Sequence, residues 1–234
     1  MIDVPSRVSS ALKALNPELA ARLVPLERLA EDRGWRPTGL GALDGLLGGG
    51  WPRAALAEIT GRRSSGRTAV VLATLAASIA AGEAAALVDA GGTFDPRAAA
   101  AAGVTLPALL WIRCPPDDAL KAADLVVAAG GFGLCALDLC DARLRVPDAA
   151  WVRLQHRARA GGTTVLVAAA ARTLGTFAAA AVELGDVAPS FLTDGPPLWA
   201  GLQVRGTSVR DRRTSSPRGE GGSPCVSLVF TCRS

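Results

Sequence analysis

The segment Gly61–Thr68 holds residue types that bind phosphate in proteins. It reads Gly-Arg-Arg-Ser-Ser-Gly-Arg-Thr, which has the spacing of the G-x-x-x-x-G-K-[ST] loop with one change. In such a loop, backbone N–H groups surround the phosphates, the lysine ammonium contacts the terminal phosphates, and the final hydroxyl holds Mg²⁺. The candidate nucleotide-binding residues of the loop are Gly61, Ser64, Ser65, Gly66, Arg67 and Thr68.

Arginine stands at position 67, where the motif has lysine. Its guanidinium is longer, planar and forked, so in a loop sized for an ammonium it must displace the phosphate or point elsewhere. Thr68 keeps the hydroxyl. An alternative explanation is a codon bias that replaces lysine throughout, but Lys13 and Lys121 survive where arginine would serve equally well. We therefore predict that the loop has lost normal nucleotide binding.

Short apolar runs alternate with longer segments on both sides of this loop. The runs predict strands at 55–60, 84–89, 109–114, 134–139, 164–169, 198–209 and 225–232. The segments between them predict helices at 40–47, 69–81, 95–102, 117–129 and 148–160. This order predicts an α/β fold with a mostly parallel central sheet flanked by helices, and with antiparallel strands at its C-terminal edge.

The chain is expected to hold one core, 39–234, that ends in a hairpin with a basic loop. Residues 1–38 are interpreted as an N-terminal helical segment. Within it, an apolar stripe over 6–29 predicts two short helices that meet at Asn16-Pro17, buried against the rest of the chain.

Composition excludes several classes of protein. No apolar stretch of about eighteen residues is free of charge or turn signals, and the start lacks a secretion signal, so we expect a cytoplasmic protein without membrane contact. The five cysteines are scattered without a Cys-x-x-Cys pair, which indicates small buried side chains and no metal site. A net charge of +4 is compatible with a nucleic-acid partner but does not require one.

Further motifs occur in the order found in the RecA recombinase core, which the sequence resembles from Gly39 to Cys232. They are Leu40-Gly41-Ala42-Leu43-Asp44, Gly48-Gly49-Gly50, Glu58-Ile59-Thr60-Gly61, Leu87-Val88-Asp89-Ala90, Phe94-Asp95-Pro96 and Ala136-Leu137-Asp138. Among RecA relatives, the chain is most similar in overall character to the ImuA family of bacterial proteins, which are induced by DNA damage and associated with translesion mutagenesis. The resemblance implies a RecA-like P-loop core.

The resemblance also identifies departures from the hydrolytic residues of RecA. A glutamate that activates the attacking water follows Asp-Ala in RecA, and Gly91 stands there in this chain. The glutamine that senses the γ-phosphate is absent from the run 168–172. Asp138 occupies the place of the Walker-B carboxylate, although it is equally compatible with a simple strand end or helix cap. We therefore expect a pseudo-ATPase with no catalytic residues and no cofactor.

The segments that match the DNA-binding loops of RecA, 140–147 and 173–197, lack basic residues interleaved with stacking groups. DNA contact is therefore expected to be weak or indirect. One basic cluster remains as a candidate for nucleic-acid or partner contact, or else as a solvated loop: Arg205, Arg210, Arg212, Arg213 and Arg218. His156, the single histidine, is interpreted as structural.

The resemblance implies an adaptor in the SOS response that binds an ImuB-type polymerase-like protein. RecA itself and an error-prone DNA polymerase are further expected partners, with the N-terminal helices and the C-terminal edge strand as candidate docking surfaces. Two alternatives stay open: a weak RecA-type ATPase that binds DNA, and an SOS cell-division inhibitor.

Overall fold

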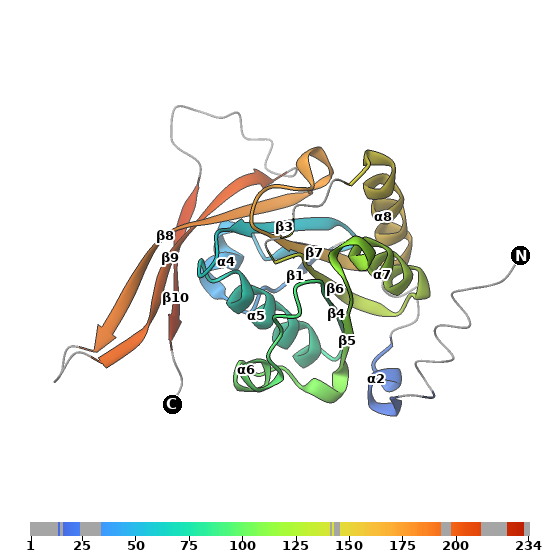
Figure 1. The fold of residues 1–234 in the computed structure, drawn as a ribbon, viewed down its shortest axis with the longest axis horizontal. Coiled ribbons are helices and arrows are strands. Elements are labelled where there is room, and N and C mark those ends of the chain that lie inside the picture. The colour runs from blue at the N-terminus through green and yellow to red at the C-terminus, as the bar shows by residue number, and fades with distance from the viewer. Residues whose placement is uncertain are drawn as a thin grey trace, which may run out of the picture.

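A single twisted sheet with helices on both faces forms the body of the protein (Figure 1). The computed structural model describes residues 14, 16–23, 34–140, 142, 146–192, 198–211 and 224–231. The strand order is β10-β9-β8-β3-β7-β6-β4-β5. The strands are β3 (Leu56–Gly61), β4 (Ala84–Asp89), β5 (Leu109–Arg113), β6 (Phe132–Asp138), β7 (Thr164–Ala169), β8 (Ala180–Leu192), β9 (Leu198–Asp211) and β10 (Cys225–Thr231).

In the spatial run β8-β3-β7-β6-β4-β5, every pair of neighbouring strands is parallel. The strands β9 and β10 pair antiparallel beyond β8, at one end of the sheet. This is the mostly parallel RecA-like α/β arrangement with an antiparallel C-terminal edge that the sequence predicts, so the expected fold class is confirmed. The helices are α2 (Pro17–Ala21), α4 (Gly41–Leu46), α5 (Arg67–Ala80), α6 (Pro96–Ala101), α7 (Pro116–Ala129) and α8 (Asp148–Gly161), with short 3-10 turns η1 (Leu106–Ala108) and η2 (Gly175–Phe177).

Two hydrophobic layers separate these helices from the sheet. On one face, α4, α5 and α6 contribute Leu43, Leu75 and Ala99 to a core with the inward side chains of the sheet. On the other face, α7 and α8 do the same, and the short helix α2 inserts Leu19, which is 1% exposed. No helix in the described ranges is both long and apolar enough to cross a bilayer.

The central strands are buried on both faces, which explains why they read as continuous apolar runs. All six residues of β4 and of β7 are buried, and both strands begin and end where the sequence predicts. In β3, Ile59 faces the α5 layer while Leu56 faces the α7 and α8 layer. Parallel strands covered on both faces require such uniformly apolar residues.

One long strand was missed by the sequence prediction. The interval 173–197, which we matched to a DNA-binding loop, holds η2 and the strand β8. β8 pairs with β3 up to Leu184 and then continues with β9 alone. Gly185 and Pro189 interrupt the apolar pattern, and a register shift near Asp186 (φ 46°) breaks its alternation. A two-stranded pair, β1 (Trp35–Arg36) with β2 (Trp51–Pro52), was not expected either.

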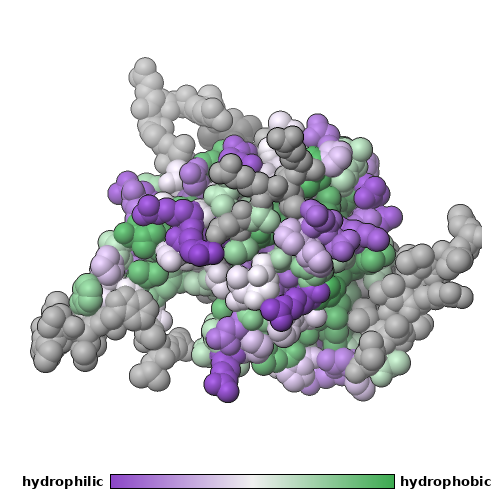
Figure 2. Space-filling model, viewed as in Figure 1, coloured by the Kyte–Doolittle hydropathy of each residue, from purple (hydrophilic) through white to green (hydrophobic). Residues whose placement is uncertain are grey.

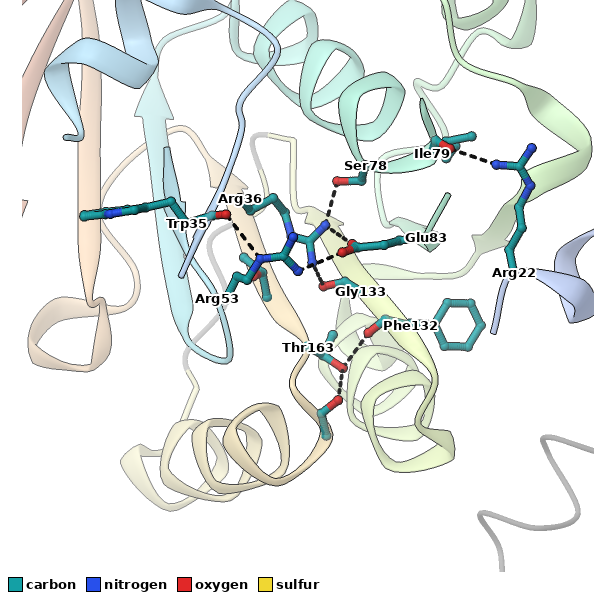
Figure 3. A network of polar contacts seen from close by, with 12 residues as sticks. Arg22, Trp35, Arg36, Arg53, Ser78, Ile79, Glu83, Phe132, Gly133 and Thr163 are labelled. Carbon is teal, nitrogen blue, oxygen red and sulfur yellow. Dashed lines mark hydrogen bonds and ion pairs between the residues drawn. The ribbon is translucent and has the colours of Figure 1, made fainter. Parts of the chain in front are cut away.

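A buried ion-pair network fastens this small pair to the main sheet (Figure 3). Arg36 is 1% exposed and donates to the Glu83 carboxylate, to Ser78 Oγ at 3.0 Å and to the Gly133 carbonyl at 2.7 Å. Arg53 binds the other carboxylate oxygen of Glu83 at 2.7 Å. The network thus joins β1, the segment after β2, α5 and the start of β6.

Glu83→Gln should lower the free energy of unfolding by about 3 kcal/mol, because it leaves two arginines facing a neutral amide, and Arg36 cannot reach water. Glu18→Gln is the matched control: Glu18 lies 3.9 Å from Arg22 in a largely exposed pair, so its loss should cost less than about 1 kcal/mol. Urea denaturation followed by circular dichroism measures both. Equal losses would contradict the role assigned to Glu83.

Candidate phosphate-binding site

The candidate residues meet at the carboxyl edge of the parallel sheet. β3 ends at Gly61, and its neighbour β7 ends at Ala169, with Thr60 and Ala169 in register. β4 and β6 end side by side at Asp89 and Asp138, which are also in register. Ligands of open α/β sheets bind at this edge, so the fold places the whole candidate site where such chemistry occurs.

The loop has the backbone of a phosphate cradle. After Gly61, the chain turns through Ser64 (φ 62°) and Gly66 (φ 87°), and α5 begins directly at Arg67. Thr68 is exposed at the first turn of this helix. A helix N-terminus with its free N–H groups attracts anions, so the backbone fits a phosphate group.

The side chains of the loop are arranged differently from those of the motif. Ser65 is 1% exposed and Arg67 is 9% exposed, so both turn into the protein, while Ser64 and Thr68 face solvent. The buried Arg67 side chain does not project into solvent at the mouth of the loop.

An aromatic ring from the far end of the chain lies against the loop. A Cβ added at Gly66 would lie 2.7 Å from Phe230 Cε2, which places this ring of β10 in direct contact with the glycine. Glycine is therefore required at position 66 for two reasons: its φ lies in the left-handed region, and the Phe230 ring leaves no room for a Cβ. No spacing rule in the sequence predicts this contact, because it joins two segments that are remote in the chain.

The position of the missing glutamate is filled by a cysteine side chain. A Cβ added at Gly91 would lie 2.7 Å from Cys140 Cβ and 3.2 Å from Cys140 Sγ. Cys140 itself has a positive φ of 53°, which is unusual for a residue with a side chain. Position 91 therefore lacks a carboxylate and, in this arrangement, also lacks room for a larger side chain unless Cys140 moves.

The two aspartates at the strand ends organise backbone turns. Asp89 is 1% exposed and accepts hydrogen bonds from the N–H groups of Thr93 (3.1 Å) and Phe94 (3.3 Å) and from Trp111 Nε1 (3.3 Å). Asp138 accepts from the Cys140 N–H at 2.8 Å and is half-buried. Asp138 therefore has the turn-forming contact of a strand-end residue, while its position next to Asp89 also matches that of a Walker-B carboxylate.

A buried carboxylate holds the segment where RecA has its sensor glutamine. Glu58 in β3 is fully buried, and its Oε1 accepts from the N–H groups of Thr173 (2.5 Å) and Leu174 (3.0 Å). Arg172 Nε lies 3.8 Å from Glu58 Oε2. Charge-assisted bonds to backbone N–H groups are strong, so Glu58 fixes the loop after β7 directly to the strand that carries the phosphate loop.

The basic cluster is only partly within the described residues. Arg205 on β9 is exposed and forms an ion pair with Asp186 at 3.3 Å, which neutralises its charge locally. Arg210 lies on β9 opposite Ala181, and Arg212, Arg213 and Arg218 lie outside the described residues. His156 is exposed on α8.

The described cysteines differ in how far their side chains are exposed. Cys135 is buried as expected, and burial raises its thiol pKa to about 12. Burial, with Asp118 and Asp89 close by, also raises the pKa of the half-buried Cys114. Cys225 is exposed on β10, so the expectation of a buried side chain is wrong there. Its position on an edge strand explains the difference, because the side chains on one face of β10, those of Cys225, Ser227, Val229 and Thr231, are exposed.

Taken together, the loop backbone fits a phosphate, while the side chains around it differ from those of the motif. A lysine is replaced by a buried arginine, the place of the glutamate is filled by Cys140, and the loop after β7 is held by Glu58.

Comparison with known proteins identifies related sequences. The family model of the RecA N-terminal domain matches residues 22–177. The curated proteins named Protein RecA from Nocardia farcinica and Mycobacterium avium are 43% and 42% identical over 106 residues, and that from Picosynechococcus is 40% identical over 105 residues. Each match covers 44% of this chain and 30% of the relative, so the chain spans about a third of the length of these relatives.

Gly91→Ala should lower the free energy of unfolding by about 1 to 3 kcal/mol, because the new Cβ overlaps Cys140. In a Cys140→Gly background the same change should cost less than half as much, since the facing Cβ is gone. Gly45→Ala on α4 is the control: it meets open space, and it should leave stability equal or raise it slightly. Chemical denaturation of the double-mutant cycle measures this coupling, and simple additivity would contradict the contact.

Proposed function

This chain belongs to the RecA family, and from that premise we propose that it is a non-catalytic member that acts as an adaptor of the ImuA type in damage-induced translesion synthesis. Its partner is an ImuB-type polymerase-like protein. RecA, whose assembly it limits, and an error-prone DNA polymerase complete the set of partners. Contact with DNA is weak or passes through these partners.

The contact between Gly91 and Cys140 is the observation that carries this proposal. A missing glutamate alone is compatible with a slow enzyme that recruits water in another way. Here the Cys140 side chain lies where a side chain at position 91 would begin, with 2.7 Å between the two Cβ positions. The Cys140 side chain lies where a water-activating side chain at position 91 would have to begin, which supports the proposal that hydrolysis is lost.

The remaining surroundings support the same reading. Arg67 is buried, and Glu58 holds the loop after β7 through two backbone hydrogen bonds. A loop fixed in this way is poorly suited to respond to a terminal phosphate. A RecA-type core that neither hydrolyses nor switches still offers a large folded surface, which is what an adaptor needs. The motif set between Leu40 and Asp138 supports the RecA core, and the ImuA assignment rests on the overall character of the sequence.

A second candidate is a weak ATPase, favoured by the exposed Thr68 hydroxyl and by Asp138 at the end of β6. These residues match the Mg²⁺-holding positions of a P-loop enzyme. Each lost hydrolytic group costs at least about 100-fold in rate, so the remaining pair is a poor basis for turnover.

Purified protein with Mg²⁺ and ATP should release no phosphate above the buffer control, and Arg67→Lys alone should not restore release, because Gly91 and the loop after β7 are unchanged. Phosphate release over hours at high protein concentration measures this, with a RecA protein as the positive control. Turnover that disappears in Asp138→Ala would replace the adaptor reading with the ATPase.

The protein should co-elute in gel filtration with a C-terminal fragment of an ImuB-type protein, and Thr68→Ala should bind equally well because the partner does not contact the loop chemistry. Failure to co-elute with both variants removes the proposed partner. Filamentation of cells that overexpress the protein without any polymerase partner would instead support the alternative of a cell-division inhibitor.

A further inference from the structure

The terminal strand β10 forms the end of the main sheet opposite to β5 (Figure 1). In the part of the chain that the structure describes, β10 pairs with β9 on one side and with no strand on the other. Its seven residues, Cys-Val-Ser-Leu-Val-Phe-Thr, include no charge, no proline and no glycine. Edge strands are usually protected by such residues, so an uncharged edge is a template for pairing with another strand.

The register between β10 and β9 shows which backbone N–H and C=O groups of β10 point away from β9. Ser208 N–H donates to the Pro224 carbonyl at 2.9 Å, and these residues stand opposite each other in the ladder that continues from Cys225 and Thr207. Directly opposed residues in antiparallel strands alternate between hydrogen-bonded and non-hydrogen-bonded pairs. The even-numbered residues therefore bond to β9, while the N–H and C=O groups of the odd-numbered residues point to the free edge: Cys225, Ser227, Val229 and Thr231.

The two faces of β10 divide in the same way. The even-numbered side chains of Val226, Leu228 and Phe230 pack into the core on the α5 side. The odd-numbered side chains are exposed, and Val229 is 54% exposed. Figure 2 shows hydrophobic surface around this end of the sheet, interrupted by a few hydrophilic side chains. The open edge itself thus carries no charge, and the nearest charged side chain on the exposed face is Arg205 of β9, opposite Ser227, which is paired with Asp186.

We propose that β10 pairs antiparallel with β10 of a second copy of this chain, about a two-fold axis at Leu228. In this register Cys225 faces the Thr231 position of the other copy, and Ser227 faces Val229. Every residue with outward-pointing backbone groups then meets another such residue, and the two main sheets become one. The same axis brings apolar neighbours together on the buried side, with Val226 opposite Phe230.

Charge and sequence symmetry favour a second copy over a strand of another protein. The pattern of outward residues is centred on Leu228, so it is complementary to itself without any shift. No like charges are opposed, whereas β5 at the other end of the sheet carries Arg113 and the bulky exposed Trp111. A symmetric interface of this kind closes at two copies. The proposal needs neither nucleotide nor polymerase, and it assigns the C-terminal edge strand, a candidate docking surface for partner proteins, to a second copy of this chain.

Val229→Pro separates this interface from folding. The N–H group of Val229 points away from β9, so proline removes no bond within the chain, and such edge positions tolerate it. Val229→Thr is the matched control, because it keeps the N–H group and the β-branched shape. By sedimentation velocity, wild type and Val229→Thr should be dimers at micromolar concentration. Val229→Pro should weaken dimerisation about 100-fold while it keeps the far-ultraviolet circular dichroism spectrum of the folded wild type.

A cross-link tests the register itself. Opposed residues of a hydrogen-bonded pair have Cα atoms about 5.5 Å apart, within the reach of a disulfide. In a Cys232→Ser background, Thr231→Cys should join the native Cys225 of the other copy under mild oxidation and give a covalent dimer. The control that also carries Cys225→Ser should give none.

Three outcomes overturn the proposal. A wild-type monomer at all concentrations means that the edge does not pair with itself. A dimer that survives Val229→Pro and forms no Cys225 cross-link places the interface elsewhere, for example at β5. Dimers that appear only when a partner protein is added make that partner the occupant of the edge. If Val229→Pro fails to fold, the cross-link still decides between these outcomes.

Discussion

Hydrogen bonding between parallel strands fixes where everything else in this protein can lie. The registers of β3 with β7 and of β4 with β6 bring Gly61, Asp89, Asp138 and Ala169 to one edge of the sheet. The phosphate loop, the turn after β4 and the loop after β7 all begin at that edge. They therefore lie close together in a small volume. The chemistry that this edge can support depends on which side chains occupy that volume.

Side chains packed against two glycines occupy part of that volume. At Gly91 the facing side chain is Cys140, and at Gly66 it is Phe230. Glu58 is buried beneath the loop after β7 and holds it through backbone hydrogen bonds. Each contact stabilises the edge, and each would have to be broken to admit a side chain or a moving loop. The rigidity of this edge therefore comes from the same contacts that fill the space around the loop.

Local sequence patterns were sufficient for the body of the fold and insufficient for its edge. The strands at 84–89 and 164–169 match to the residue because buried parallel strands are apolar at every position. β8 was missed because Gly185 and Pro189 interrupt its pattern and because its outer half needs only β9 as support. The partners of Glu58 and of Gly66 come from remote segments, and no periodicity encodes a contact of that kind. The sequence singles out Gly91 as a departure from RecA, but its contact with Cys140 depends on the positive φ of the cysteine, which the sequence does not reveal.

The ring of Phe230 against Gly66 ties the anion-binding turn to the last strand of the sheet. Linkage requires that two sites which share a movable group influence each other equally in both directions. A solute that enters the turn and displaces this ring would alter the affinity at the outer margin of β10 by some factor, and occupation of that margin would alter the affinity for the solute by the same factor. The turn and the outer margin of β10 would in this way each respond to what occupies the other.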